Sequence, residues 1–308
     1  MGIARNVLLY ASKNPWLREA LPRYRFAREA VRRFMPGENI SEALQAAGGF
    51  QPEGISVVLT YLGENVTDAQ QAGSVANHYC DVLRLISEAG INCEVSVKLT
   101  QLGQDISPEL GFNNVSKVVE VANATGNYIW IDMEESRYVD STLDLYRRLH
   151  RQHQNTGVCL QAYLYRTADD LRSLLPLRPG IRLVKGAYKE PADIAFPKKS
   201  DVDENFFRLS ELLLDGSKDN SVRAGIATHD PRLVQRIQER ARQAQVPPNA
   251  YEFQMLYGIR TEALRSLVRS GHKCRILISY GPAWFPWYMR RLAERPANVL
   301  FVLRNVWS

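Results

Sequence analysis

The sequence predicts an α/β fold, a distorted (β/α)8 barrel of the TIM type with an N-terminal helical arm. Short β-branched runs alternate with amphipathic segments along most of the 308 residues, and successive runs start 23 to 42 residues apart. That spacing suits one strand, one helix and two loops. Eight such units in roughly 250 residues fit a parallel barrel better than a doubly wound sheet.

The chain opens with a basic, aromatic segment. Residues 1–36 hold eight of the 39 Lys and Arg residues and two of the 33 Asp and Glu residues, which leaves 31 of each for the rest. A neutral body argues against nucleic-acid binding. The segment suits a helix on an anionic membrane surface or one packed on the body, and we favour packing. Its aromatic residues include Trp16, Tyr24, Phe26 and Phe34. We place the arm at residues 1–50 and the catalytic barrel at 51–308.

After Pro36-Gly37 the chain changes to short, nearly continuous apolar runs, which are typical of strands covered on both faces. No linker rich in Pro, Gly or Ser divides this part. The predicted strands cover residues 55–61, 93–99, 128–132, 157–163, 181–185, 223–228, 251–256 and 274–279. The predicted helices between them include residues 74–89, 139–153, 204–214, 231–244 and 261–270.

Composition predicts a cytoplasmic protein. The N-terminus lacks the apolar core of a secretory signal, and no apolar stretch approaches the length of a membrane-spanning helix. The four cysteines are scattered without a CxxC pair, so we expect buried, reduced thiols. Peripheral contact with the inner face of the membrane would come through the basic arm.

Polar side chains follow nearly every predicted strand. In this fold the carboxyl ends of the strands surround the catalytic site. Charged residues within apolar runs, such as Lys98, Arg182 and Lys185, are costly to bury unless they are paired or used. Their convergence at one opening predicts an active site there. The polar residues at the strand ends include Glu64, Lys98, Asp132, Glu134, Glu135, Gln161, Tyr163, Arg166, Arg182, Lys185, Tyr188, Thr228 and His229.

Several familiar site motifs are absent. No GxGxxG segment opens a helix, and the sequence has no Walker A loop, HExxH or G-x-S-x-G. We predict no metal site. His150 and His153 fit a solvated pair better than metal ligands, and Asp132 and its acidic neighbours alternate in direction along the strand end.

The residues alone support two enzyme classes equally. In the first, Lys185 or Lys98 forms a Schiff base, as in barrel aldolases and lyases. In the second, the barrel holds a flavin, which needs donors along its pyrimidine edge and a cation near N5 or N1. Gln161, Arg182 and Lys185 are the right residue types for that role. A non-catalytic barrel that only binds a partner is a third interpretation, and the intact set of charged residues argues against it.

Eight segments in order resemble the proline dehydrogenase family, in its short monofunctional bacterial form. The segments, within residues 40–300, are LGE, VKLTQLG, IDMEES, LQAYLYR, RLVKGAYKEP, ATHDPR, EFQMLYGIR and RRLAERP. The resemblance implies a distorted (β/α)8 barrel with non-covalent FAD. It also implies oxidation of L-proline to Δ1-pyrroline-5-carboxylate by hydride transfer to flavin N5, with electrons passed to a membrane quinone.

The resemblance also implies roles for particular residues. Asp132 and Arg182 would be catalytic, with Arg182 near flavin N5. Glu64 would gate the substrate by pairing with one of two adjacent arginines, and we expect Glu294 to supply a further counter-charge. The substrate contacts would be Lys98, Tyr188, Leu256, Leu277, Arg290 and Arg291. The FAD contacts would be Met133, Gln161, Arg182, Lys185, Gly186, Ala187, Thr228 and His229.

The eighth strand departs from the family pattern. That pattern has a tyrosine closing the pocket over the proline ring, and Leu277 stands in its place. The following Pro282-Ala283-Trp284 replaces the usual charged turn. A leucine leaves a roomier and more apolar pocket. The alternative to proline is therefore the same flavin chemistry on a substituted proline such as hydroxyproline.

Overall fold

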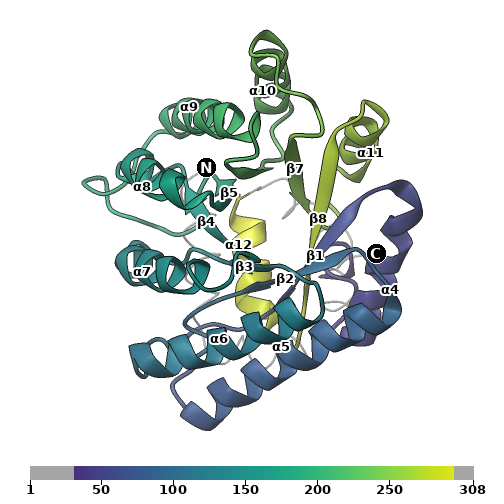
Figure 1. Cartoon of the computed structure of the whole chain (residues 1–308), viewed down its shortest axis with the longest axis vertical. Coiled ribbons are helices and arrows are strands. Elements are labelled where there is room, and N and C mark those ends of the chain that lie inside the picture. Colours follow the sequence, from purple (N-terminus) through teal and green to yellow (C-terminus); the bar gives the residue numbers. More distant parts are fainter. Residues whose placement is uncertain (1–30, 295–308) are drawn as a thin grey trace, which may run out of the picture.

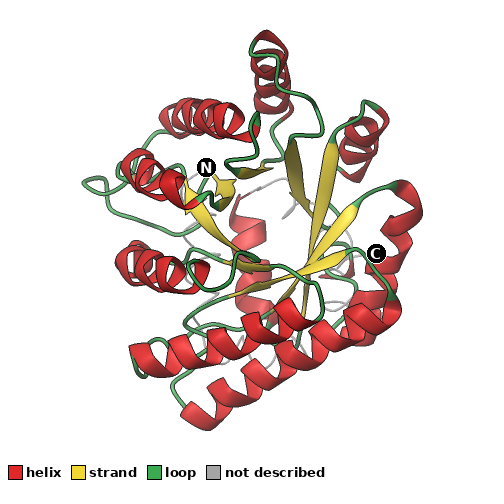
Figure 2. Ribbon diagram, viewed as in Figure 1, coloured by secondary structure: helices red, strands yellow, loops and turns green. Residues whose placement is uncertain are grey.

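The eight predicted strands form a closed parallel barrel. The computed structural model describes residues 31–294. The strands pair in sequence order, and β1 closes the ring against β8. Helices surround the sheet, as Figures 1 and 2 show. The predicted (β/α)8 fold is confirmed.

Each strand lies within a few residues of its predicted position. The strands are β1 (Ser56–Tyr61), β2 (Cys93–Val97), β3 (Ile129–Ile131), β4 (Thr156–Gln161), β5 (Gly180–Val184), β6 (Arg223–Ala227), β7 (Tyr251–Leu256) and β8 (Lys273–Tyr280). The helices are α4 (Ile40–Phe50), α5 (Ala69–Ala89), α6 (Pro108–Ala124), α7 (Val139–His150), α8 (Thr167–Leu174), α9 (Lys199–Ser217), α10 (Pro231–Gln243), α11 (Thr261–Arg269) and α12 (Trp284–Glu294).

Local sequence fixes where several helices begin. The side chains of Asp68, Ser107 and Asp230 accept backbone N–H groups in the first turns of α5, α6 and α10. Proline at the first position of α6 and α10 suits a residue whose N–H has no partner inside the helix. These caps place the loops between strand ends and helices, and so position the side chains at the carboxyl-terminal opening.

The last helix lies over this opening instead of outside the sheet. α12 follows β8 directly, and Figure 1 shows it inside the ring of outer helices. The place outside β8 and β1 is taken by α4, whose buried Ala43 and Ala47 pack against these strands. The barrel is distorted in this sense: α4, from before the first strand, covers β8 and β1, and the helix that follows β8 lies over the opening.

The segment before α4 packs against α12. Phe34 and Met35 are buried in one apolar cluster with Trp284 and Tyr288. The indole N–H of Trp284 donates to the Glu38 carboxylate at 2.9 Å. Part of the predicted arm therefore packs on the barrel.

The rest of the predicted arm is not described. Residues 1–30, which include Trp16, Tyr24 and Phe26, lie outside the described range, so contact between the arm and a membrane stays a prediction. The division into residues 1–50 and 51–308 also stays a prediction. Between residues 31 and 294, no helix has the length and apolar character needed to cross a bilayer.

The core lies between the sheet and the outer helices, where alternate strand residues are apolar and buried. All four cysteines are free and buried, as predicted from their spacing. Burial raises the pKa of the Cys159 thiol to about 12, so this thiol is protonated near neutral pH.

Candidate active site

Four polar side chains meet inside the barrel toward its carboxyl-terminal opening. They come from β2, the end of β3, and β5, where alternate residues face inward. We call Ser96, Lys98, Asp132 and Arg182 the mouth cluster. Asp132 Oδ1 accepts from Ser96 Oγ at 2.7 Å and from Arg182 Nη1 at 3.0 Å, and Oδ2 accepts from Lys98 Nζ at 3.3 Å. The predicted catalytic pair, Asp132 and Arg182, is thus in direct contact.

The cations around Asp132 keep it ionised. Burial alone would raise the pKa of this carboxyl, but Lys98, Arg182 and the Ser96 hydroxyl outweigh burial and lower it. Asp132 is therefore a carboxylate that holds two cations in place, and is poorly suited to act as a proton donor.

Arg182 is almost fully buried and held on three sides. Besides Asp132, its Nη1 donates to Ser96 Oγ at 2.9 Å, and its Nε donates to Gln254 Oε1 at 2.8 Å. The guanidinium carbon lies 4.7 Å from the centre of the Trp130 ring. Its Nη2 has no hydrogen-bond partner although it is buried. An arginine N–H pair left unsatisfied inside a protein is costly, so an acceptor is expected there.

Gln161 has a buried acceptor without a partner, whereas Arg182 has a buried donor without one. Its Nε2 donates to the backbone oxygens of Met133 and Glu134 at 3.3 and 3.1 Å, which fixes the amide. Its Oε1 is buried and has no partner. Arg182 and Gln161 therefore offer one donor group and one acceptor to a bound molecule.

The structure places Lys185 outside the mouth cluster. Its ammonium is paired with Asp203 of α9 and lies 3.4 Å from Asp230, the cap of α10. Lys185 therefore lies on the outer side of the β5 end. An ammonium engaged by two carboxylates is not a free nucleophile, which disfavours the Schiff-base interpretation at this residue.

The next residues along the rim are packed closely. Gly186 has φ of 116°, and a Cβ there would lie 2.3 Å from the Tyr163 ring, so only glycine fits. Ala187 and Tyr188 follow and are half-buried. Thr228 is buried after β6, and His229 Nε2 accepts the backbone N–H of Leu256 at 2.9 Å. Because this nitrogen is an acceptor, the His229 proton is assigned to Nδ1.

The predicted apolar substrate contacts are neighbours. Leu256 of β7 and Leu277 of β8 are register partners, and both are half-buried. On β8, Leu277 is two residues from the inward-facing Arg275, so it also faces the interior. Ser279, two residues further, has a buried hydroxyl without a partner.

The segment that carries Glu64 is fixed by the loop after β2. Asn65 has φ of 54°, and its N–H donates to Thr100 Oγ1 at 3.1 Å. Thr100 in turn donates its N–H and hydroxyl to the buried Glu134 carboxylate, at 3.1 and 2.6 Å. Glu64 is half-buried. Its predicted partners, Arg290 and Arg291, and also Glu294, lie on α12 with side chains outside the described part, so the gate stays a prediction.

One expectation about histidine was wrong. His150 is buried, not solvated, and its ring contacts Thr156 Oγ1 at 3.0 Å and the Leu177 carbonyl oxygen at 3.1 Å. Both ring nitrogens serve the packing of α7 on the barrel. Among residues 31–294, no three His, Cys, Asp or Glu side chains gather as metal ligands would.

Comparison with known proteins identifies the family. A family model described as "Proline dehydrogenase" matches residues 43–304. Proline dehydrogenase 1 of Bacillus subtilis is 37% identical over 303 residues, which cover 98% of each chain. The chain belongs to the proline dehydrogenase family. The proline dehydrogenase of Deinococcus radiodurans is also 37% identical, over 280 residues and 89% of each chain.

A solved structure supports the fold independently. Proline utilization A of Bdellovibrio bacteriovorus superimposes with a TM-score of 0.81 at 22% identity. The match covers 94% of this chain and 36% of that protein. This likeness supports the (β/α)8 fold, and the family model and the bacterial relatives confirm the predicted family resemblance.

Sequence reasoning missed several residues of the site. Ser96, Trp130 and Gln254 all contact Arg182, and Glu134, expected only as a polar residue at a strand end, anchors the loop after β2. A signal existed for the first three, since each lies two residues from a predicted inward position or strand end. Their contacts across the barrel depend on strand register, which the sequence does not show.

Proposed function

We propose that this protein oxidises L-proline to Δ1-pyrroline-5-carboxylate, with FAD as the bound oxidant and a quinone as electron acceptor. The observation that carries the proposal is the buried, unpartnered Nη2 of Arg182 beside the carboxylate of Asp132. Family membership supports oxidation of proline, and the unpartnered donor of Arg182 supports a bound acceptor at the barrel opening.

The residues present fit a flavin. Arg182 Nη2 offers donors, and Gln161 Oε1 offers an acceptor for a ring N–H. Met133, Gly186, Ala187, Thr228 and His229 surround the same strand ends. When bound, FAD supplies the oxidant that accepts a hydride from the ring carbon next to nitrogen. A fixed cation nearby favours the negative charge that reduction brings.

The mouth cluster would bind and orient the amino acid. Lys98 lies at the opening with its side chain 12% exposed, and it can meet a carboxylate. The proline nitrogen has to be neutral for a C=N bond to form, since the oxidation removes a hydride from carbon and a proton from nitrogen. Leu256 and Leu277 form an apolar side for the ring. Most of the rate enhancement would then come from positioning.

Flavin content and turnover test this proposal together. Purified protein should show a flavin spectrum, or gain one on addition of FAD, and proline should bleach it without added acceptor. Arg182→Met should lose flavin affinity or turnover by about a hundredfold. Arg172→Met, an exposed arginine of α8, is the matched control and should change neither. A wild-type protein that stays colourless with FAD would refute the proposal.

The Leu277 position supports a second candidate substrate, a ring-substituted proline. Two half-buried leucines and the unpartnered Ser279 hydroxyl line this side of the opening. Turnover of proline and of 4-hydroxyproline should be compared in wild type and Leu277→Tyr. If the substituted ring is the substrate, the variant should lose about 1–3 kcal/mol of discrimination, which is about fivefold or more in relative kcat/KM. An unchanged ratio would exclude this candidate.

The electron acceptor needs its own measurement. We propose a quinone, which would oxidise the reduced flavin after product release. Stopped-flow mixing of proline-reduced protein with a soluble short-chain quinone should restore the oxidised spectrum faster than air does. Reoxidation by air at the same rate would argue against quinone as the acceptor.

A further inference from the structure

Arg182 is held by a glutamine that lies outside the proposed substrate and FAD contacts. Gln254 of β7 accepts from Arg182 Nε at 2.8 Å, and its own Nε2 donates to Glu252 Oε1 at 2.7 Å. Gln254 is 3% exposed, so water does not compete for these bonds. Its side chain therefore links the guanidinium to a buried carboxylate.

The two partners allow only one orientation of the Gln254 amide. Arginine has donors and no acceptor, and an ionised carboxylate has acceptors and no donor. A flipped amide would place NH2 against the guanidinium of Arg182 and oxygen against the carboxylate of Glu252. Both bonds would be lost at once, so the amide oxygen is fixed toward Arg182.

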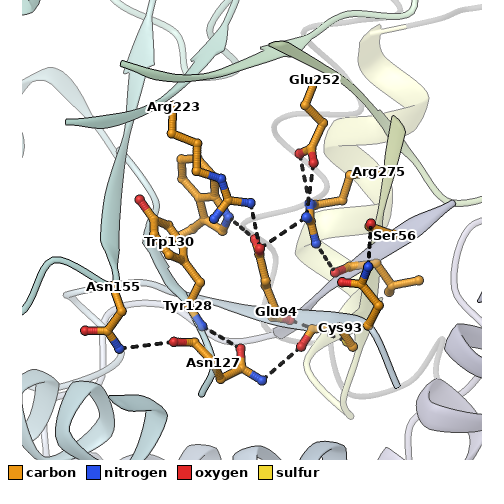
Figure 3. A network of polar contacts seen from close by, with 12 residues as sticks. Ser56, Cys93, Glu94, Asn127, Tyr128, Trp130, Asn155, Arg223, Glu252 and Arg275 are labelled. Carbon is orange, nitrogen blue, oxygen red and sulfur yellow. Dashed lines mark hydrogen bonds and ion pairs between the residues drawn. The ribbon is translucent and has the colours of Figure 1, made fainter. Parts of the chain in front are cut away.

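Glu252 is anchored in turn by charged residues near the amino ends of the strands. We call Glu94, Arg223, Glu252 and Arg275 the basal ion cluster, and Figure 3 shows their side chains converging. Arg275 contacts both Glu252 oxygens, at 2.8 and 3.0 Å, and it contacts Glu94 at 3.1 Å. Burial opposes ionisation of Glu252, but Arg275 outweighs burial and lowers its pKa. A charged carboxylate that accepts two hydrogen bonds from one guanidinium is held rigidly in place.

The same cluster also holds the face of the Arg182 guanidinium. Glu94 accepts the indole N–H of Trp130 at 2.7 Å and pairs with Arg223 at 2.6 Å. The Trp130 ring lies under Arg182, with 4.7 Å between guanidinium carbon and ring centre. The contacts close a ring: Arg182, Gln254, Glu252, Arg275, Glu94, Trp130 and back to Arg182.

The backbone makes room for this arrangement at Gly225. A Cβ at this position would lie 2.6 Å from Gln254 Nε2. Real Cβ contacts are never that short, so the amide would have to move. Glycine in the middle of β6 is otherwise unfavourable, which is consistent with close approach of another group.

We infer that Gln254 is a positioning residue that sets where the unpartnered Nη2 of Arg182 points, with the basal ion cluster as its anchor. The functional half of this inference rests on the proposed flavin chemistry, because Arg182 matters to the reaction only if it meets the cofactor. The structural half concerns the protein alone and can be measured without FAD.

The structural half is tested in flavin-free protein by NMR of arginine side chains. The Nε–H resonance of Arg182 is assigned by its loss in Arg182→Lys. In Gln254→Met, which keeps the volume and removes the acceptor, Nε–H exchange with solvent should become at least tenfold faster. The Trp130 indole N–H should keep its exchange rate, since its partner Glu94 is untouched. Equal Arg182 exchange in both proteins would overturn the inference.

Two further variants control this test. Gln235→Met removes an exposed glutamine bonded to Glu239 at 3.0 Å on α10, and should leave Arg182 exchange unchanged. Gly225→Ala displaces the Gln254 amide while keeping every hydrogen-bonding group. Like Gln254→Met, it should make exchange of the Arg182 Nε–H with solvent faster. Gly225→Ala also serves if Gln254→Met does not fold. Acceleration by the surface control would show a global effect and would refute a local one.

The functional half uses the FAD-loaded protein. Gln254→Met should lower kcat about tenfold to a hundredfold, with KM changed less than about threefold, because a misplaced group costs orientation. The flavin potential should fall by about 30 mV, which corresponds to a tenfold weaker preference for the reduced form. Unchanged kcat and potential with altered NMR exchange would refute only the functional half. Failure of wild type to bind FAD would refute the proposed function and leave the NMR result standing.

Discussion

Glu134 offers a prediction whose size follows from its surroundings. Its side chain is 4% exposed and accepts two hydrogen bonds from Thr100. Burial raises the pKa of Glu134 from 4.5 to about 7, and nearby Glu64 adds to the rise. The Thr100 bonds and Lys98 act in the opposite direction and are outweighed.

The sign of the effect follows from proton binding. Between pH 4.5 and 7 the folded protein holds a proton at Glu134 that the unfolded chain has lost. The stability contributed by this proton is fully present below pH 4.5 and is lost as pH rises through 7. The rise in the pKa of Glu134 from 4.5 to about 7 corresponds to about 3 kcal/mol.

Glu134→Gln removes the ionisation and keeps the shape. The amide oxygen can accept from the Thr100 N–H, and the amide NH2 can donate to the Thr100 hydroxyl oxygen. The free energy of unfolding of the variant, relative to that of wild type, should therefore increase by about 2 to 3 kcal/mol between pH 5 and pH 8. Urea unfolding of both flavin-free proteins across this range measures the difference.

A surface glutamate provides the control for Glu134→Gln. Glu120→Gln, at an exposed position of α6, removes one carboxylate without disturbing the site. Its stability relative to wild type should not change with pH. If Glu134→Gln and Glu120→Gln follow the same pH profile, the reasoning about burial at Glu134 is refuted.

Three other substitutions test the packing. Asp132→Asn leaves its two cationic partners without a carboxylate, and should cost about 3 kcal/mol in urea unfolding of flavin-free protein. Gly258→Ala places a Cβ 1.6 Å from the Arg33 carbonyl oxygen at φ of 72°, so limited proteolysis before α4 should become faster than in wild type. Arg275→Met in the basal ion cluster should cost about 3–5 kcal/mol, whereas Arg84→Met on the surface should cost less than about 1 kcal/mol. Equal cost for these last two would contradict the argument from burial.

The barrel could be predicted from the sequence because its signal is periodic and repeated. Eight apolar runs at regular spacing leave few alternatives, and each strand lies within a few residues of its prediction. The helical signal is not equally strong in every outer helix. α6 is rich in valine, including Val115, Val118 and Val119, which lowers its helix propensity.

The site was only partly predictable, because contacts across a barrel depend on register. Alternation along each strand places Lys98 and Asp132 inward, and the structure brings them together. Alternation alone does not show which residue of β7 contacts Arg182, because the strands are staggered around the barrel. Lys185 shows how much the helices add to the contacts of a strand-end residue. Three residues after Arg182, its ammonium is paired with Asp203 of α9, and its predicted contact with FAD stays a prediction.

Inside the barrel, the unsatisfied polar atoms lie at one end. Among the inward-facing strand residues, the buried atoms without partners belong to Thr60, Gln161, Arg182 and Ser279, all in the half toward the carboxyl-terminal opening. The basal ion cluster has none, although three of its four charged side chains, Glu94, Glu252 and Arg275, are at most 13% exposed. A polar interior kept only for stability would be satisfied at both ends. The asymmetry therefore indicates that the basal half serves as a scaffold and that the opening is shaped for a ligand, as the catalytic face of this fold requires.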